Sequence, residues 1–551
     1  MLPAAQPARL LCAAVLAAAL SLVPSAHAAP ANGIPLCTAT GDQSLPVTVT
    51  DGFGGIIVAW HDDRLTADGV CYAQRQSTVG PQWGMDGEAL STTPDAGAPV
   101  IASDGAGGAF VAYGGQSAAP RIQHVNLVGA LQWGPDGVQL STNAPTMRDL
   151  TIAADVGGSG GAFVAWREDN ASGGFSDIFA QKVNSSGAIQ WGGPGIAITN
   201  TNTMSEGVPE LLSDGAGGVF VVWAGGGLHL QHFNAAGIAQ WSQVNLGSTS
   251  SQVPASMVSD GSGGFVFAWS TGSGAFIQRV NSAGTRLWVP NAGVTLSANG
   301  RAPTAIPDGS GGAIVAWEDN RTSTNYDIYA QKMSSSGAAQ WTANGAPVCV
   351  FTGDQRAPQI VSDGIGGAII TWYDARMSAA SGTDIFAQRI DGTGAAQWTS
   401  NGIPLCTAPN NQDFPTMASD GSDGAWVAWE DLRGGGTNHD IYAARVGPSG
   451  TVVGVPAADG SSSTSRVWPE PFTSRVEMEF VAPVATGVHA TVVDLRGRVV
   501  ADLGSSRLSP GAHRVAWDGR TSDGRAAAAG VYFLRVEGPG IALSRRVVRL
   551  K

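Results

Sequence analysis

The sequence predicts an all-β protein, a β-propeller followed by a small β-sandwich. Three observations support this prediction. The 551 residues include 76 glycines but only 13% charged side chains, which is typical of many tight turns between apolar strands. A glycine-rich turn recurs eight times before about residue 455, and the pattern of the chain changes after residue 465.

The N-terminus has the layout of a secretory signal peptide, predicted at residues 1–28. Arg9 precedes the apolar run Leu10 to Val23, and the small-residue pattern Ala26-His27-Ala28 follows it. The run is too short for a convincing membrane anchor, and no later stretch approaches the roughly 18 apolar residues of a spanning helix. We therefore predict a secreted or cell-surface protein without a transmembrane segment in the mature chain. Cys12 lies inside the run rather than at its end, so a lipoprotein is the less favoured alternative.

The charge balance argues against nucleic acid as a partner. The chain has 30 basic and 43 acidic side chains, for a net charge of −13. A negative surface repels phosphate backbones instead of concentrating them.

Four cysteines follow the predicted signal peptide, too few in this length for a disulfide scaffold. Three of them end related segments, Pro35-Leu36-Cys37, Pro347-Val348-Cys349 and Pro404-Leu405-Cys406, and the fourth is Cys71. The shared context predicts buried small side chains rather than disulfide partners.

Eight copies of a glycine turn define the repeats of residues 30–455. They are spaced 46 to 59 residues apart, close to the roughly 40–50 residues of a propeller blade. The turn has the form Asp-Gly-x-Gly-Gly, with an expanded third copy and a Gly-to-Asp variant in the last. The copies begin at Asp51, Asp104, Asp155, Asp214, Asp260, Asp308, Asp363 and Asp420.

Each repeat contains the apolar segments of a four-stranded blade. A continuous apolar run such as Ala368–Trp372 follows the glycine turn and predicts a strand buried on both faces. A second run, Asp384–Gln388, leads to a Gly-x-x-Gln-Trp segment that contains Trp398. The stretch before the turn, Ala357–Val361, predicts the remaining strand.

The two ends of the repeat region predict a closed ring. Asn32–Thr38 repeats Asn401–Thr407 residue for residue, so the first copy is a strand without a blade of its own. We predict that it completes the last blade, since pairing the chain ends removes exposed sheet edges. The prediction is eight blades, with a seven-bladed ring and one degenerate repeat as the alternative.

A Trp-x-Asp-x-Arg motif is the most chemically distinctive feature of the repeats. Alternation along a strand places its three side chains on one side. We expect each Arg to form a structural ion-pair clamp between its own Asp and the Asp that opens the next strand, at Asp327, Asp384 or Asp440. The motif occurs at Trp60/Asp62/Arg64, Trp317/Asp319/Arg321, Trp372/Asp374/Arg376 and Trp429/Asp431/Arg433.

The distribution of this motif suggests a second, functional interpretation. Repeats 6, 7, 8 and 1 carry it, whereas repeat 3 has the altered set Trp166/Glu168/Asn170/Asp177. In a closed ring these four repeats form one contiguous arc. The alternative hypothesis is an acidic rim that holds calcium or a polar ligand through Asp62, Asp319, Asp374 and Asp431, because hard cations prefer oxygen ligands.

The sequence contains no linear motif that identifies an enzyme. No Gly-x-Ser-x-Gly elbow or His-Glu-x-x-His helix is present, and the glycine turns fit neither a calcium loop nor a phosphate loop. His229 and His232 are three residues apart, which places them on opposite faces of a strand. The sequence thus favours a protein without catalytic activity or cofactor, although a propeller can assemble a site from several blades.

The last segment of the chain has a different character. A Ser-rich stretch at residues 456–465 predicts a linker. Residues 466–551 then contain alternating strands and turns, with Trp468-Pro469-Glu470-Pro471-Phe472, Val493–Val500, Trp517-Asp518-Gly519-Arg520 and Gly530–Val536. This segment resembles the Ig-like domain of the flagellar hook-cap protein FlgD and the C-terminal sorting domains of type IX secretion substrates.

The resemblance implies an Ig-like β-sandwich that acts in export or surface attachment, with the secretion machinery or cell envelope as partner. Two departures are Glu470, where such domains usually have Asn, and an end rich in arginine at Arg545, Arg546 and Arg549. For Trp517, Asp518 and Arg520 we predict a turn-stabilising cluster rather than a recognition site.

These observations favour an exported surface protein that acts as a binding or structural module for a glycan or protein ligand. The alternatives are a carbohydrate-binding module and a propeller hydrolase whose site is assembled from several blades. Because the repeated tryptophans are predicted to pack between blades, they give no support to an exposed sugar-binding face.

Overall fold

The computed structural model describes an all-β protein, which confirms the predicted fold class at this level. It describes residues 32–550 apart from 79, 95–96, 115–118, 144–146, 170–173, 201–204, 247–252, 379–381, 454–465, 469–471, 483–485, 495–497, 510 and 539–540. The predicted signal peptide, the predicted linker, Asn170 and Glu470 lie outside these residues. In the described part of the chain all regular elements are strands, so no helix there could span a membrane.

The repeats form small antiparallel sheets, numbered here 1 to 8 in the order of their glycine turns. Sheets 1 to 4 have the strands β2 (Gln43–Thr50), β3 (Ile56–Asp62), β4 (Val70–Ser77), β5 (Gly80–Pro81) and β6 (Glu88–Ala89); β7 (Val100–Ser103), β8 (Ala109–Tyr113), β9 (Arg121–Val125) and β10 (Val138–Gln139); β11 (Met147–Ala154), β12 (Ala162–Asp169), β13 (Ser176–Val183) and β14 (Ile196–Ala197); and β15 (Glu210–Ser213), β16 (Val219–Ala224), β17 (Leu228–Phe233) and β18 (Val244–Asn245).

Sheets 5 to 8 follow the same order, from a first strand before the glycine turn to a short fourth strand. They have the strands β19 (Val253–Ser259), β20 (Phe265–Thr271), β21 (Gly274–Val280) and β22 (Val294–Ser297); β23 (Gly300–Pro307), β24 (Ala313–Asp319), β25 (Asp327–Met333) and β26 (Ala346–Cys349); β27 (Gln355–Ser362), β28 (Ala368–Asp374), β29 (Asp384–Ile390) and β30 (Ile403–Cys406); and β31 (Gln412–Ser419), β32 (Ala425–Asp431), β33 (Asp440–Val446) and β34 (Val452–Val453).

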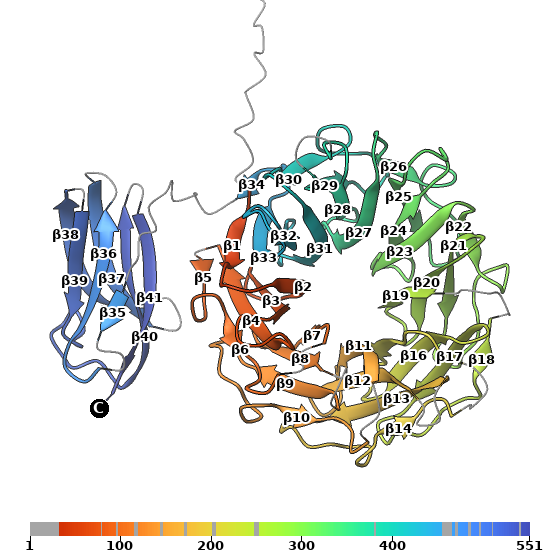
Figure 1. Ribbon diagram of the computed structural model, residues 1–551, viewed down its shortest axis with the longest axis horizontal. Helices are drawn as coiled ribbons and strands as arrows, with labels where there is room; N and C mark the ends of the chain where they lie inside the picture. Colours follow the sequence, from red (N-terminus) through yellow and green to blue (C-terminus); the bar gives the residue numbers. More distant parts are fainter. Residues whose placement is uncertain are drawn as a thin grey trace, which may run out of the picture.

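The eight sheets are arranged around a common axis (Figure 1). The first strands of successive sheets contact one another in an unbroken cycle that ends with β31 against β2. The outer strand of sheet 8 is β1 (Ile34–Cys37), which pairs antiparallel with β33. The predicted pairing of the two ends of the repeat region is thereby confirmed.

The glycine turn is fixed by its aspartate. In sheet 1 the carboxylate of Asp51 accepts hydrogen bonds from the backbone N–H groups of Phe53 and Gly55, at 2.7 and 2.8 Å, and pairs with Arg75 at 2.8 Å. The same two backbone contacts recur at Asp104 and Asp363, among others. The repeated Asp is therefore a structural residue of the turn, as Asp side chains in turns generally are.

The hydrophobic core lies between the sheets. Each apolar cluster joins side chains of two neighbouring sheets, as Ile370 and Trp372 of sheet 7 join Ile328 and Ala330 of sheet 6. The second strand of each sheet is covered on both faces by its neighbours. These strands are therefore continuously apolar in sequence.

In sheets 1 to 7 a tryptophan at the outer end of the sheet links it to the next. Trp341 Nε1 donates a hydrogen bond of 3.0 Å to the carbonyl oxygen of Gly392 in the following sheet. The receiving turn contains Gly394 at φ +88°, and a Cβ atom there would lie 2.7 Å from the Trp341 ring. The equivalent donors are Trp83, Trp133, Trp191, Trp241, Trp288 and Trp398, at 2.9 to 3.3 Å.

The C-terminal strands form two further sheets with a shared core. Trp517 is fully buried there and makes edge contacts with Phe472 and Tyr532. Its Nε1 donates to the carbonyl oxygen of Arg520 at 2.7 Å, which confirms the predicted turn contact. The strands are β35 (Arg466–Trp468), β36 (Val476–Ala482) and β39 (Gly511–Trp517) in one sheet, and β37 (Thr486–Asp494), β38 (Val499–Leu508), β40 (Gly530–Gly538) and β41 (Ile541–Arg549) in the other.

Removal of β1 tests how the ring closes. A mature chain that begins at Ala39 lacks the buried side chains Ile34 and Leu36 and leaves β33 with an unpaired edge. We expect its free energy of unfolding to fall by about 4 kcal/mol and the protein to self-associate. Urea unfolding and sedimentation velocity would measure both effects. A chain that begins at Asn32 is the control, and equal behaviour of the two chains would show that β1 does not close the ring.

Candidate functional site

The Trp-x-Asp-x-Arg motif builds a compact polar cluster at the end of the second strand of its sheet. Trp372 and Asp374 are two residues apart on β28, so their side chains share a face, and the indole Nε1 donates to Asp374 Oδ2 at 2.8 Å. The guanidinium Nη2 of Arg376 lies 2.6 Å from the same oxygen, and its backbone N–H donates to Oδ1 at 2.9 Å. The carboxylate is fully buried.

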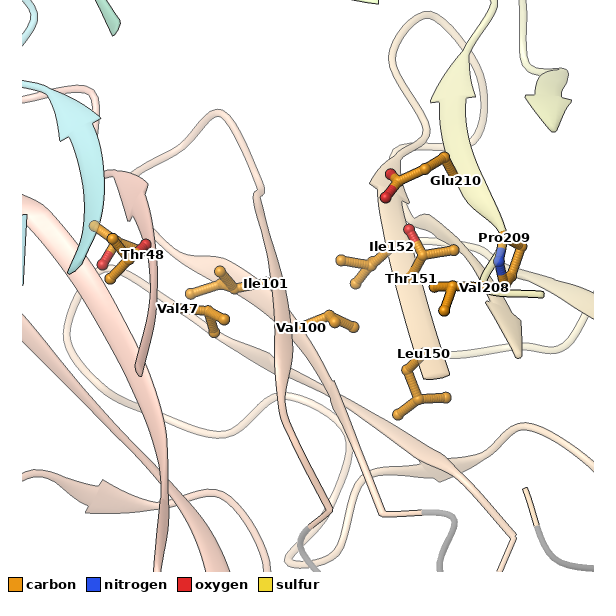
Figure 2. Close-up of a pocket in the computed structure, with 11 residues that line it drawn as sticks. Val47, Thr48, Val100, Ile101, Leu150, Thr151, Ile152, Val208, Pro209 and Glu210 are labelled. Carbon is orange, nitrogen blue, oxygen red and sulfur yellow. The ribbon is translucent and has the colours of Figure 1, made fainter. Parts of the chain in front are cut away.

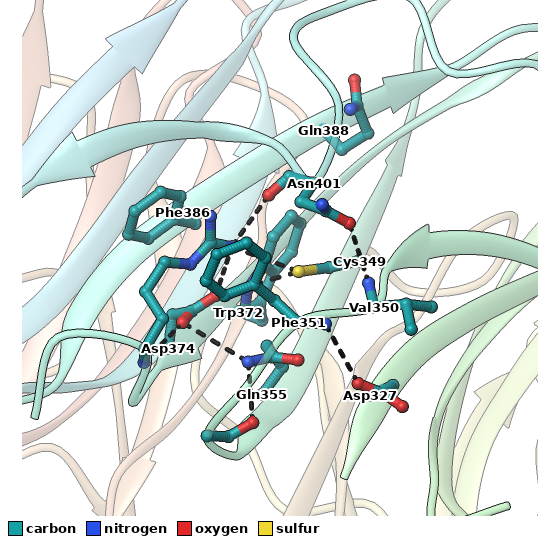
Figure 3. Close-up of polar contacts among 12 residues, drawn as sticks. Asp327, Cys349, Val350, Phe351, Gln355, Trp372, Asp374, Phe386, Gln388 and Asn401 are labelled. Carbon is teal, nitrogen blue, oxygen red and sulfur yellow. Dashed lines mark hydrogen bonds and ion pairs between the residues drawn. The ribbon is translucent and has the colours of Figure 1, made fainter. Parts of the chain in front are cut away.

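The same arginine connects two sheets, and its partners Asp374, Cys349 and Asn401 are labelled in Figure 3. Its Nη2 donates to the carbonyl oxygen of Asn401 at 2.8 Å within sheet 7, and lies 3.1 Å from the Sγ of Cys349 in sheet 6. The guanidinium also stacks on the ring of Phe386, 4.0 Å from its centroid. The cluster thus fixes the position of one sheet against the next.

The cluster recurs at all four predicted sites. Cys37 and Cys406 contact Arg64 and Arg433 at 2.9 and 3.2 Å, and Ser297 takes the place of the thiol beside Asp319. The ion pairs Asp62–Arg64, Asp319–Arg321, Asp374–Arg376 and Asp431–Arg433 measure 2.5, 2.7, 2.6 and 2.5 Å.

The second partner of the arginine differs from the sequence prediction. Arg321 contacts both oxygens of Asp319 and the carbonyl oxygen of Asn344, whereas Asp327 accepts hydrogen bonds from Asn325 and from the backbone of Phe351. The two aspartates instead lie opposite each other on paired strands, as do Asp374/Asp384 and Asp431/Asp440. A carbonyl oxygen near the fourth strand, which linear spacing does not reveal, takes the predicted place of the second carboxylate.

The paired carboxylates have different electrostatic surroundings. Burial alone would raise the pKa of Asp319, but hydrogen bonds from Arg321, Ser297 and Trp317 hold it below its ordinary value. Burial and, to a smaller extent, the neighbouring Asp431 raise the pKa of Asp440 to about 6. In the Asp319/Asp327 pair the first carboxylate is thus stabilised in its charged form, whereas burial raises the pKa of the second, Asp327.

The described residues contain no assembled cluster of side chains that would serve as calcium ligands. Among them, no group of three or more His, Cys, Asp or Glu side chains lies close enough to hold a metal ion. Asp62, Asp319, Asp374 and Asp431 each already accept hydrogen bonds from a tryptophan and an arginine. Calcium binding by this arc stays a prediction.

A pocket of about 330 Å³ lies at the centre of the ring, against the first strands of sheets 1 to 4 and 8. Figure 2 shows these side chains around a common space, with Glu210 among them. They are Val47, Thr48, Val100, Ile101, Leu150, Thr151, Ile152, Val208, Pro209, Glu210 and Thr416.

Glu210 is the one ionisable side chain among these pocket residues, and the sequence analysis missed it. The Glu210 side chain is half-buried, and its partial desolvation in the pocket raises its pKa to about 7. The available signal was positional: Glu210 stands four residues before the turn aspartate Asp214, where the other seven repeats have Val, Thr, Ser or Gln.

The two histidines of sheet 4 have separate roles. His229 Nε2 lies 2.7 Å from the carbonyl oxygen of Gly225, and His232 Nε2 lies 2.9 Å from the turn residue Asp214. Each histidine thus has a hydrogen-bond partner of its own.

The polar cluster predicts a large effect of removing its arginine. In Arg376→Met the fully buried Asp374 loses its cation, and we expect the free energy of unfolding to fall by about 3–5 kcal/mol. Arg475→Met is the matched control, because the Arg475–Glu477 pair is exposed and such pairs contribute about 0–1 kcal/mol. Urea denaturation measures both variants, and similar losses would contradict a structural role for the cluster.

The raised pKa of Asp440 predicts a pH dependence of stability. The folded protein binds this proton more tightly than the unfolded chain, so stability falls as pH rises from about 4 to above 6. The variant Asp440→Asn cannot lose this proton, so its stability should not fall in this way. Its free energy of unfolding relative to the wild type should rise by about 1–2 kcal/mol between pH 4 and pH 7.5, a value reduced for the partial exposure of Asp440. Thermal unfolding across this range tests it, with the exposed Asp68→Asn as control. If the stability difference between Asp440→Asn and the wild type does not change with pH, the raised pKa of Asp440 is refuted.

Comparison with known proteins identifies the C-terminal part of the chain. The family model of the FlgD Ig-like domain matches residues 470–539, and no curated protein sequence matches the chain.

Three solved structures are similar over larger parts of the chain. A protein of unknown function from Dyadobacter fermentans is 11% identical, with a TM-score of 0.33 over 53% of this chain and 94% of its own. A puromycin hydrolase is 12% identical, with a TM-score of 0.40 over 82% of this chain and 61% of its own. PorZ, a surface component of the type IX secretion system of Porphyromonas gingivalis, is 10% identical, with a TM-score of 0.23 over 94% of this chain and 82% of its own. The family match thus covers the C-terminal part of the chain: residues 470–539 match the FlgD Ig-like domain, as the resemblance of this segment predicts.

Proposed function

We propose that this chain is an exported binding protein, in which an eight-bladed β-propeller recognises a ligand and the C-terminal Ig-like domain directs export or surface attachment. The observation on which the export role rests is the FlgD Ig-like domain at residues 470–539, which follows the last repeat. The N-terminal signal pattern of residues 1–28 agrees with it.

Eight blades are favoured over seven by the regularity of the sheets. Each glycine turn lies between the first and second strands of its own sheet, and the degenerate copies at Asp155 and Asp420 do so as well as the regular ones. Contacts between first strands join all eight sheets.

Recognition is favoured over hydrolysis by the chemistry of the central pocket. Glycoside hydrolysis normally uses two carboxylates, and acyl transfer uses a nucleophile activated by a neighbouring base. The residues that line the pocket offer one carboxylate, Glu210, together with threonine hydroxyl groups and apolar side chains. The Trp-x-Asp-x-Arg clusters, whose groups bond to one another, serve in this proposal to hold the sheets together.

Cell fractionation tests the export role. The full chain is compared in its native host with a chain that ends at Val453. We expect the full chain on the cell surface or in the medium and the shortened chain inside the cell envelope. Equal distribution of the two would contradict a role of the C-terminal domain in export. Thermal unfolding of the purified shortened chain controls for misfolding.

A glycan and peptide array probed with the mature chain tests recognition. It is run once with calcium and once with a chelator. Saturable binding supports the recognition role, and loss of that binding with chelator supports the calcium hypothesis for Asp62, Asp319, Asp374 and Asp431. No binding in either condition favours a structural surface protein.

A further inference from the structure

The central pocket combines an apolar wall with a single carboxylate. Val47, Val100, Leu150 and Val208 supply aliphatic surface, and threonines supply hydroxyl groups that can donate or accept hydrogen bonds. Glu210 begins β15 and lies among them in Figure 2. A pocket of about 330 Å³ is within the range that holds a small organic molecule.

Glu210 differs in charge from the residues at the same position in the other seven repeats. The residue four places before the turn aspartate is Val47, Val100, Thr151, Glu210, Ser256, Thr304, Gln359 or Thr416 in the eight repeats. Seven of these are neutral, so the repeat itself does not require a carboxylate there. A feature that the architecture does not need is a candidate for a ligand contact.

The charged side chains on the strands around Glu210 are paired with other groups. On the adjacent first strand β11, Arg148 pairs with Asp169 and Asp149 pairs with Arg167, each at 2.6 Å. The strands β16 and β19, which flank β15 on its other sides, contain no ionisable residue.

The charged residues of the remaining first strands, each seven positions before its turn aspartate, also have partners. Arg301 pairs with Glu318 at 2.6 Å, Arg356 with Asp354 at 2.8 Å, and Asp413 accepts a hydrogen bond of 2.6 Å from Thr383. Strands β2 and β7 have no ionisable side chain. In the described structure, then, the cations on these strands have partners other than Glu210.

We propose that the central pocket binds a small organic cation, an ammonium group on an aliphatic body, with Glu210 as its counter-ion. The aliphatic body contacts the valines and leucine, and the ammonium group donates to the Glu210 carboxylate and to threonine hydroxyl groups. This inference rests on the proposed recognition role of the ring and names the class of ligand. An anion is disfavoured because it meets the carboxylate, and a neutral ligand leaves that charge poorly solvated.

The proposal has a defined pH dependence. An aliphatic amine stays protonated up to about pH 10, so between pH 5.5 and 8.5 only Glu210 changes charge. A carboxyl group with a pKa of about 7 is almost fully ionised at pH 8.5 and about 3% ionised at pH 5.5. The affinity for the cation should therefore be about 30-fold higher at pH 8.5.

Isothermal titration calorimetry of the mature chain with hexylammonium tests the proposal, with 1-hexanol as the neutral probe of the same length. We expect saturable binding of hexylammonium at pH 8.5, about 30-fold weaker binding at pH 5.5, and at least tenfold weaker binding of hexanol. Glu210→Gln should weaken hexylammonium binding at least tenfold and abolish its pH dependence. Glu537→Gln is the matched control, because Glu537 is exposed in the C-terminal domain. This variant should bind hexylammonium as the wild type does.

A second variant separates the pocket from the charge alone. Val100→Phe adds bulk to the wall and should weaken binding of hexylammonium while Glu210 is retained. Thermal unfolding of each variant confirms that it folds. Absence of hexylammonium binding by the wild type, or equal binding by the wild type and Glu210→Gln, overturns the proposal.

The outcomes also distinguish this inference from the proposed function. Array binding together with no response to hexylammonium would leave the recognition role in place and remove the cation site. Glu210-dependent binding of hexylammonium, together with equal secretion of the full and shortened chains, would support the site and contradict the export role.

Discussion

The hydrogen bond from a tryptophan indole to the next sheet is the interaction on which the ring depends. Each such bond joins the outer end of one sheet to the turn of its neighbour, as Trp288 Nε1 joins Ser335 at 2.9 Å. One bond of this kind contributes about 1 kcal/mol, but the indole also covers the turn glycine, Gly337, whose positive φ allows the close approach. This contact recurs at the same place in the interfaces that follow sheets 1 to 7, although the repeats differ in length.

The interface between sheets 8 and 1 is built differently, since the outer strand of sheet 8 comes from the opposite end of the repeat region. The strand β1 is supplied from the N-terminal end, and Trp426 Nε1 donates to Gly54 at 3.0 Å in place of the usual tryptophan contact. Leu45 N–H donates to Glu430 at 2.6 Å, and His439 contacts Asp42 at 2.8 Å. These polar contacts join the two ends of the repeat region, and equivalent contacts from Ala357 to Glu318 and from Tyr326 to Asp354 join sheets 6 and 7.

The sequence predicted the features that a repeat displays in one linear segment. The glycine turns and the continuous apolar strands were sufficient to predict the repeated sheets. The duplicated segment at Asn32–Thr38 was sufficient to predict how the two ends of the repeat region pair. Contacts between segments of different sheets were not predictable in detail. Cys349 was expected to be a buried apolar side chain, and it is buried, but it also contacts Arg376, which lies 27 residues further along in the next sheet. Glu210 was missed because no motif surrounds it. Its place in a pocket depends on apolar side chains that other repeats supply.

The two halves of the ring differ in the side chains that join their sheets. The interfaces from sheet 5 through sheet 8 to sheet 1 contain the buried Asp–Arg clusters, which fix register more than they add stability. Aromatic pairs cluster in sheets 2 to 5, for example Phe220 with Phe265 at 4.9 Å and Phe267 with Trp269 at 5.0 Å. Packing of this kind supplies apolar area without charged partners. Glu210 lies in that second half, and because the charged side chains of the adjacent strand β11 pair with Asp169 and Arg167, the proposed cation would supply the counter-ion of its carboxylate.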